Sequence, residues 1–283
     1  MVDDFIPEIW TARILENLRA ALVFGGPQIV NRDYEGDIAD AGDTVHITSF
    51  TDPTVGTYTA EQDITVQSIT DDTLALVVDQ ARYFAFDVDD VTRRQAMAGW
   101  VESVTRAGSY KLAEVIDGYI SLAMYTAING GANDLGDLTI DISDNNAYNA
   151  LVNLRTTLTN DSVPNQGRWV VVPPEVYAAL LQDNRFIDAS ASADGGAALR
   201  NGFVGRAAGF DVFESTTAPE PTANRWAVIA GHPMAFTFAQ QITEVMAQSR
   251  ELRFGDLVKG LVLYGGKAVR PTCLAMYTAV VQA

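Results

Sequence analysis

The stretch from Asp89 to Ile128 constrains the fold of this chain more than any other part of the sequence. Its apolar residues recur in steps of three and four, which is the period of an amphipathic helix. They are Met97, Trp100, Val101, Val104, Leu112, Val115, Ile116, Tyr119, Ile120, Ala123 and Ala127. Asp89 and Asp90 favour a helix start, and Asn129-Gly130-Gly131 favours a stop. The predicted helix would be a rod of roughly 58 Å, along which other parts of the chain must lie.

The charge of the chain argues against one class of function. The net charge is −17, which disfavours a protein that grips nucleic acid through its phosphates. The acids are concentrated between Asn31 and Asp90, where fourteen stand against only two bases, Arg32 and Arg82. Two interpretations stay open for this acidic region: a solvated face, or a negative arm that pairs with arginines of another copy.

Composition also excludes several architectures. The only cysteine is Cys273, so neither an intrachain disulfide nor a multi-cysteine metal site is possible. No run of 18 uncharged apolar residues occurs, so we expect no membrane span and no membrane partner. The start MVDDFIPEIW carries acids where a secretory signal peptide needs bases.

The region before the long helix is predicted to be an arm followed by a hairpin. A short amphipathic helix near Pro7 to Leu22 leads into a segment without periodicity, which is typical of an extended arm. Residues 44–86 are rich in β-branched and aromatic residues, and TVHITSF alternates. ITVQSIT and TLALVVDQARYFAF follow, and together these stretches predict a long hairpin. A hairpin of this kind is not stable alone in water and needs a surface to lie on.

The region after the long helix changes to short alternating elements. A glycine-rich turn over 129–137 precedes a helix from Asn145 to Leu158, a buried strand over residues 168–172 and a second helix beginning at Pro173-Pro174. Further strands at 210–215 and 226–230 complete a predicted α/β module. We expect the three closing strands, EVMAQSREL, LVKGLVLYGGKAVRP and CLAMYTAVV, to return to the long helix and the hairpin as an elongated layer.

A search for catalytic or ligand-binding motifs finds none that is complete. His46 and His232 stand alone, and both are interpreted as structural residues, His232 in a turn. Gly260 to Lys267 misses the phosphate-loop spacing and is interpreted as a strand with a glycine bend. Asp134, Asp137, Asp141 and Asp144 miss the calcium-loop pattern and indicate a solvated acidic turn. We therefore predict no catalytic residues, metal or cofactor, although 36 acids leave a carboxylate-dependent hydrolase as a remote alternative.

The order of these elements resembles the tailed-phage major capsid proteins with the Hong Kong 97-like fold. Four stretches carry the resemblance: NRDYEGDIADAGDTVHI, RWVVVPPEVYAALLQDNRFIDA, GFVGRAAGFDVFEST and ELRFGDLVKGLVLYGGKAVRP. The resemblance implies an α+β fold with an N-terminal arm (1–43), an extended hairpin loop (44–86) and a long spine helix. It further implies a peripheral domain (87–135 and 236–283) and an α/β axial domain (136–235).

The resemblance also implies a function. Many copies of the chain would form pentamers and hexamers of an icosahedral shell, which encloses double-stranded DNA without sequence-specific binding. The protein would be part of the virion, assembled in the host cytoplasm, with separate scaffolding, portal and decoration proteins as further partners. The alternative on the same fold is an encapsulin-type compartment that carries protein cargo. The contents of the shell would decide between the two, and the acidic arm and hairpin favour the phage.

Candidate contact residues follow from the expectation that function rests on assembly rather than on chemistry. Two arginines at the start of the long helix could accept a neighbour's acids, and the hairpin tip and a glycine turn could touch neighbours. The candidates are Asp52, Pro53, Thr54, Val55, Gly56, Arg93, Arg94, Gly202, Gly205, Gly209 and Asp256. Solvent-exposed loops and helix-surface charges stay open as the alternative for each.

The sequence departs from the founding member of the family in two respects. That protein joins subunits through an isopeptide bond from an extended-loop lysine to an asparagine of the closing strands. Here the only lysines are Lys111, Lys259 and Lys267, all outside the hairpin, and the matching closing stretch has Asp256. We therefore predict no such crosslink. The arm begins at Met1, so we expect scaffolding to be a separate protein or a segment already removed.

Overall fold

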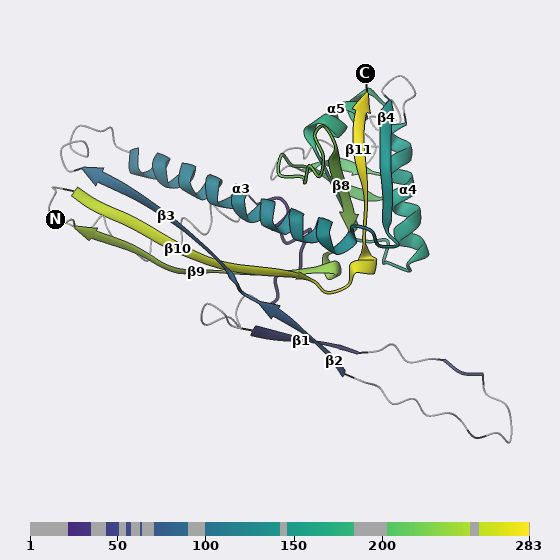
Figure 1. Ribbon diagram of the computed structural model, residues 1–283, viewed down its shortest axis with the longest axis horizontal. Coiled ribbons are helices and arrows are strands. Elements are labelled where there is room, and N and C mark those ends of the chain that lie inside the picture. Colours follow the sequence, from purple (N-terminus) through teal and green to yellow (C-terminus); the bar gives the residue numbers. More distant parts are fainter. Residues whose placement is uncertain are drawn as a thin grey trace.

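A long helix, an extended hairpin and a mixed sheet occupy three regions of this α+β molecule (Figure 1). The described strands form one sheet of two strands, one of three and one of six. The structure, a computed structural model, describes residues 22–34, 44–50, 55–57, 63, 71–89, 100–141, 146–183, 203–249 and 255–282.

The predicted long helix is present as α3 (Trp100–Ile128). Its buried apolar residues are again spaced by one helical turn, since Leu112, Ile116, Ile120 and Met124 are 0–6% exposed. The predicted stop at Asn129-Gly130-Gly131 is confirmed, and Gly130 has the positive φ of 72° that suits a residue just past a helix end. The predicted start at Asp89 is wrong, because Asp89 ends strand β3 (Gln80–Asp89), and residues 90–99 lie outside the described ones.

One face of α3 packs on an antiparallel sheet of three strands in the order β3-β10-β9 (Figure 1). The other two strands are β9 (Phe236–Ser249) and β10 (Gly255–Ala268), so the predicted strand over Gly260 to Lys267 is confirmed. The Tyr264 ring is fully buried and meets the Tyr119 ring edge to face, with 5.3 Å between ring centroids.

The hairpin is formed by β1 (Thr44–Phe50) and β2 (Asp71–Val77), which pair antiparallel from Thr44↔Val77 to Phe50↔Asp71. The prediction that the hairpin extends through residue 86 is wrong. After Val77 the chain changes sheets within two residues, and β3 pairs with β10 instead of β1. The reason is the partner surface: Phe84 of β3 packs against the main core, to which the hairpin strands do not belong.

The α/β module is a six-stranded sheet in the order β4-β11-β8-β5-β7-β6. Its predicted alternation of helices and buried strands is confirmed, and two helices and two short 3-10 turns complete it. The elements are β4 (Asp134–Asp141), α4 (Ala147–Asn160), β5 (Trp169–Val172), α5 (Pro174–Gln182), β6 (Phe203–Ala207), β7 (Phe210–Glu214), β8 (Trp226–Gly231), η2 (Pro233–Ala235), η3 (Pro271–Cys273) and β11 (Leu274–Gln282).

Two sequence predictions about this sheet are wrong. The closing strand β11 lies between β4 and β8 rather than in the elongated layer with β9 and β10. Its residues Leu274 to Ala279 are all buried, as expected for a strand covered on both faces. The second correction concerns the glycine-rich turn predicted over 129–137, because a strand, β4, already begins at Asp134 and runs parallel to β11.

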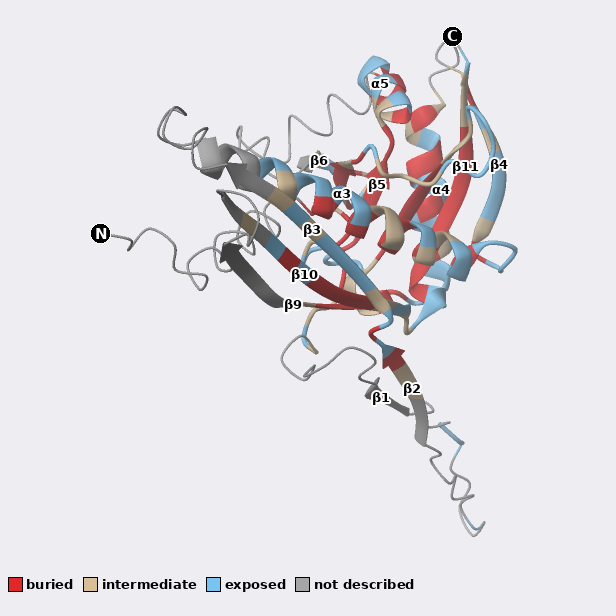
Figure 2. Cartoon of the chain, turned by 60° about the vertical axis from the view of Figure 1, so that its left-hand side comes forward, coloured by how far each residue is buried: buried red, intermediate tan, exposed pale blue. Residues whose placement is uncertain are grey.

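Part of the predicted arm is built into the core. Leu22, Phe24, Ile29 and Val30 are 0–1% exposed and belong to the main hydrophobic cluster. Asn31 then forms a parallel bridge with Thr237 at the start of β9. Burial differs between the regions of the molecule: the six-stranded sheet is mostly buried, whereas β3 and the outer side of α3 are largely exposed (Figure 2).

Candidate subunit interface

Among the strands that the structure describes, β1 and β2 pair only with each other. Among the described residues the hairpin meets the rest of the chain at its base, where Ile47, Leu76 and Val78 pack against Ala239 and Leu263 in a small second core. The two strands extend from this base away from the sheet and helix (Figure 1). An isolated two-stranded hairpin is at best marginally stable in water. The parts of the two strands beyond the base therefore leave surface that a partner can cover.

The structure describes only two of the five residues that are predicted to make contacts at the hairpin tip, Val55 and Gly56. Val55 is 98% exposed, and no atom lies within 4 Å of the position that a Cβ would take at Gly56. Asp52, Pro53 and Thr54 lie outside the described residues. The role of the tip in contacts between subunits therefore stays a prediction.

The face of the three-stranded sheet that points away from α3 carries exposed apolar side chains. Tyr83 on β3 is 78% exposed and stands opposite Leu261 on β10, which is 37% exposed. The neighbouring Lys259 is exposed as well. The sequence analysis missed this surface, although the alternation in ARYFAF places Tyr83 opposite to Phe84 and Phe86. The predicted contact residue Asp256 pairs with Val88 at the end of β10, and its side chain lies outside the described ones.

A buried carboxylate on α3 holds the arm in place. Asp117 accepts hydrogen bonds from the backbone N–H of Val23 at 2.7 Å and of Gly25 at 2.9 Å. Burial raises the pKa of this carboxyl to about 6, although the N–H donors of residues 23–25 and the charge of Arg32 act to lower it. Sequence reasoning missed Asp117, for which the one available signal is an acid between the buried positions Ile116 and Ile120.

Arg32 secures the other side of the same turn. Its Nη1 donates to the carbonyl oxygen of Gly25 at 3.0 Å, and its guanidinium lies over the Phe238 ring, 5.5 Å from the centroid. The arm is thereby fixed to both α3 and β9. The direction in which the chain enters the subunit is set by these contacts.

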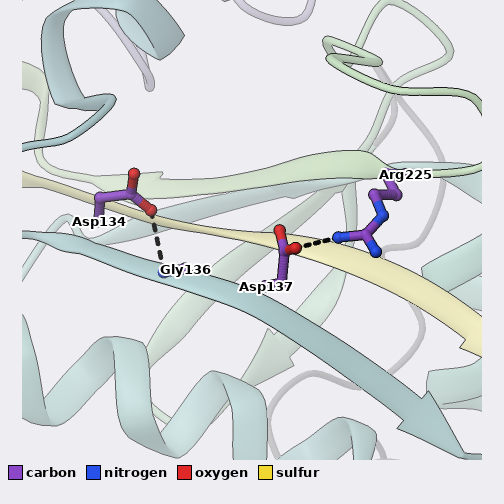
Figure 3. A network of polar contacts seen from close by, with 4 residues as sticks. All are labelled: Asp134, Gly136, Asp137 and Arg225. Carbon is purple, nitrogen blue, oxygen red and sulfur yellow. Dashed lines mark hydrogen bonds and ion pairs between the residues drawn. The ribbon is translucent and has the colours of Figure 1, made fainter.

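The predicted acidic turn is an ordered brace (Figure 3). The Asp134 carboxylate accepts from the backbone N–H of Gly130 and of Gly136, each at 3.0 Å, and so ties the end of α3 to the start of β4. Asp137 forms an ion pair with Arg225, which precedes β8 (Figure 3). These acids shape the edge of the module.

The remaining predicted contact residues are only partly described. Gly209 lies in the tight turn between β6 and β7 with a φ of 84°, which favours glycine, and Gly205 lies at an irregularity of β6. Gly202, Arg93 and Arg94 lie outside the described residues. Gly205 and Gly209 therefore both lie in the β6–β7 hairpin at the edge of the six-stranded sheet, and their contacts with neighbours stay a prediction.

The described residues offer no group of three or more His, Cys, Asp or Glu side chains that could hold a metal ion. His232 is a turn residue, as predicted: its Nδ1 accepts from Met234 N at 3.3 Å at the start of η2. In the part of the chain that the structure describes, no helix is long and apolar enough to span a membrane.

Comparisons with known proteins agree with the architecture. A family model described as phage capsid protein matches residues 51–276. A chain from Mycobacterium phage Che8 is 32% identical, the match covers 98% of each chain, and the TM-score is 0.68. The capsid of the cyanophage P-SCSP1u is 13% identical, with 86% of this chain and 85% of that chain covered and a TM-score of 0.65. No curated protein sequence matches.

An encapsulin shares the fold at a greater distance. The holo-SrpI encapsulin complex from Synechococcus elongatus PCC 7942 is 11% identical over 84% of this chain and 82% of that chain, with a TM-score of 0.53. Identity this low indicates a common fold and no more. The Hong Kong 97-like fold predicted from the sequence is confirmed. Since the family model covers most of the chain and a phage protein matches it from end to end at 32% identity, this chain belongs to the phage capsid protein family.

Proposed function

We propose that this major capsid protein forms pentamers and hexamers of an icosahedral head shell, and that each subunit is completed by its neighbours. The proposal rests on the position of the hairpin. Among the described residues, its two strands pair only with each other and contact the rest of the chain only at their base. A hairpin of this kind gains stability when it lies on another surface. In a shell of many copies, that surface belongs to the next subunit.

The proposed division of the subunit follows the three regions of the fold. The α/β module is the axial domain, meeting its copies around the fivefold and quasi-sixfold axes. Helix α3 and the three-stranded sheet form the peripheral domain near the threefold axes. In this proposal β11 is assigned to the axial domain, because it lies in the six-stranded sheet, and β3 to the peripheral domain, because it pairs with β10.

The distribution of charged residues supports the exposed sheet face of a neighbouring subunit as one surface on which the hairpin lies. Residues 44–77, which include both hairpin strands, have five acids and neither lysine nor arginine, while the sheet face with Tyr83 and Leu261 carries the exposed Lys259. Opposite charges on two partners direct their encounter and fix their register. Arg93 and Arg94 are proposed as additional acceptors for these acids, and Gly202, Gly205, Gly209 and Asp256 as further contacts.

The acidic composition also suits a container for DNA. A wall that carries negative charge does not grip phosphates, so DNA can be enclosed without sequence-specific binding and can leave again. The protein is a virion component, and we propose that it assembles in the host cytoplasm with separate scaffolding, portal and decoration proteins. No covalent crosslink between subunits is proposed, since the hairpin lacks a lysine.

Shell formation by the purified protein tests the proposal. Size-exclusion chromatography and negative-stain microscopy should reveal hollow particles rather than a small oligomer, and denaturing gels should return them to monomers. A ladder of covalent oligomers would refute the absence of crosslinks. Particles from infected cells should contain DNA, whereas a protein cargo would favour the encapsulin-type alternative that shares this fold.

Charge reversal at Arg93 and Arg94 tests the proposed acceptors. The double variant should assemble less well while its thermal unfolding stays unchanged, because the proposed partners of these two charges belong to another subunit. Reversal of Arg106, an exposed arginine of α3, is the matched control for the loss of positive charge. Unchanged assembly of the double variant would remove Arg93 and Arg94 from the interface.

A further inference from the structure

The base of the hairpin crosses β10 at a single glycine. A Cβ placed on Gly265 would overlap the carbonyl oxygen of Val77 and lie 2.9 Å from the Cα of Val78. These are backbone atoms, which cannot rotate aside as the end of a side chain can. The close approach therefore requires glycine at this position.

The joint around this crossing is small. Its buried side chains are Ile47, Leu76, Val78, Ala239 and Leu263, which form a cluster separate from the main core. Tyr34, Leu74 and Val269 pack around it, and Lys267 Nζ donates a hydrogen bond to the carbonyl oxygen of Ala75 at 3.1 Å. Because few of the described residues hold the hairpin, each of them has a large share in deciding the direction in which it leaves the sheet.

Other glycines of β10 meet different neighbours. A Cβ on Gly260 would overlap the Phe84 ring, and a Cβ on Gly266 would lie 2.7 Å from the Phe236 ring. Both rings pack with the main core. Of these three glycines, Gly265 is the one that faces the hairpin backbone, so substitutions along a single strand can separate folding from hairpin direction.

We propose that Gly265 is a positioning residue for shell assembly, since it lets the hairpin base lie directly on β10 and thereby sets the direction of the hairpin. The inference rests on the proposed role of the hairpin in contacts between subunits. Gly265→Ala pushes residues 77–78 away from β10, and the displacement grows along the hairpin because the tip is far from the joint. A neighbour then meets a tip in the wrong place.

Distance measurements between spin labels test the joint without assembly. Labels on Val55→Cys and Val115→Cys report the hairpin tip and α3, both at exposed positions. The native Cys273 is buried, and burial raises the pKa of its thiol, so it reacts poorly with the labels. In unassembled subunits Gly265→Ala should shift the distance distribution. Gly118→Ala, on α3 with no atom within 4 Å of the added Cβ, should leave it unchanged.

Assembly of the unlabelled chains supplies the second measurement. Gly265→Ala should raise the subunit concentration needed for shells by about tenfold or more, with a thermal unfolding midpoint close to that of wild type. Gly260→Ala should do the reverse, lowering the midpoint because Phe84 must move in the main core, while the protein that stays folded still assembles.

Each result decides the inference. A shifted label distance together with weaker assembly supports it. An unchanged label distance overturns it, and so does a Gly265→Ala chain that does not fold, because Gly265 would then belong to the main core. A shifted distance with wild-type assembly would overturn the positioning role and the proposed contact function of the hairpin together, while leaving the geometry of the joint intact.

Discussion

Strands β5 and β2 are both short, yet they obtain their neighbours differently. All four residues of β5 are buried, and β8 and β7 flank it in the sheet. In β2, Leu76 is buried at the hairpin base whereas the adjacent Val77 is 45% exposed. Among the described strands, β2 pairs with β1 alone. One chain therefore holds two kinds of strand: those that its own fold completes, and those that we propose a second copy completes.

The largest effect on stability is expected in the six-stranded sheet, where β5 has both of its neighbouring strands within the chain. Trp169→Ala removes a 1%-exposed ring from β5 and should lower the free energy of unfolding by about 3–5 kcal/mol. Val55→Ala, at the hairpin tip, should change it by less than about 0.5 kcal/mol. Urea denaturation of unassembled subunits measures both. Similar losses in the two variants would break the distinction between the regions.

The arm provides an intermediate case, because a buried carboxylate fixes it. Burial raises the pKa of Asp117 from 3.8 to about 6, so the folded state binds this proton more tightly than the unfolded chain. The contribution of the protonated Asp117 carboxyl to the free energy of unfolding is therefore complete below about pH 4 and is lost as pH rises through 6. At about 1.4 kcal/mol per pH unit, the group contributes about 3 kcal/mol to the difference between these limits.

Asp117→Asn removes this pH dependence. The unfolding free energy of wild type minus that of the variant should grow by up to about 3 kcal/mol as pH falls from about 7 to about 4. Subtracting the variant cancels the other groups that titrate in the same range. Parallel stability profiles for the two proteins would show that the carboxyl does not titrate there and that the arm is held independently of its charge.

Two tyrosines in neighbouring strands give a smaller and more specific effect. Tyr264 is fully buried under α3, whereas Tyr83 is 78% exposed on the opposite face of the same sheet. Tyr264→Ser should destabilise the subunit, while Tyr83→Ser should leave its unfolding unchanged and raise the concentration needed for assembly by about tenfold, or about 1.4 kcal/mol. Light scattering follows the assembly. Normal assembly of Tyr83→Ser would remove this sheet face from the interface.

The sequence predicted correctly those elements whose starts, ends or burial depend on residue types within a few positions. The glycine stop after Ile128, the buried strand β5 and the helix α5 that begins at Pro174 all follow from residue types within a few positions. Contacts between distant segments could not be predicted in this way. Val78 and Asp79 separate two sheets within a run of strand-forming residues, because β2 and β3 have different partner strands.

The buried face of α3 shows the same limit. The helical period placed Val115 and Ala127 on the apolar face, but both are exposed, while Asp117 and Ser121 are buried. Asp117 is buried because the arm, 94 residues earlier in the chain, brings backbone N–H groups to it. Ser121 donates to the carbonyl oxygen of Thr217 at 2.8 Å. A polar residue can therefore lie inside when a distant segment satisfies it.

The smallest expected effect concerns the surface of the self-completed module. Arg225→Ala breaks the ion pair with Asp137, whose side chain is 66% exposed, and should cost no more than about 1 kcal/mol in unfolding free energy. Salt at about 1 M screens exposed charges beyond about 3 Å, so the wild type and the variant should then converge. Asp134, by contrast, accepts two backbone N–H groups, and Asp134→Ala should destabilise the module at any salt concentration, because the turn between α3 and β4 loses its brace. If the Arg225 effect exceeded that of Asp134 and persisted in salt, surface charge would be holding the module edge. The module would then resemble the hairpin, and the line between strands completed within the chain and strands completed by a neighbour would have to be drawn inside the six-stranded sheet itself.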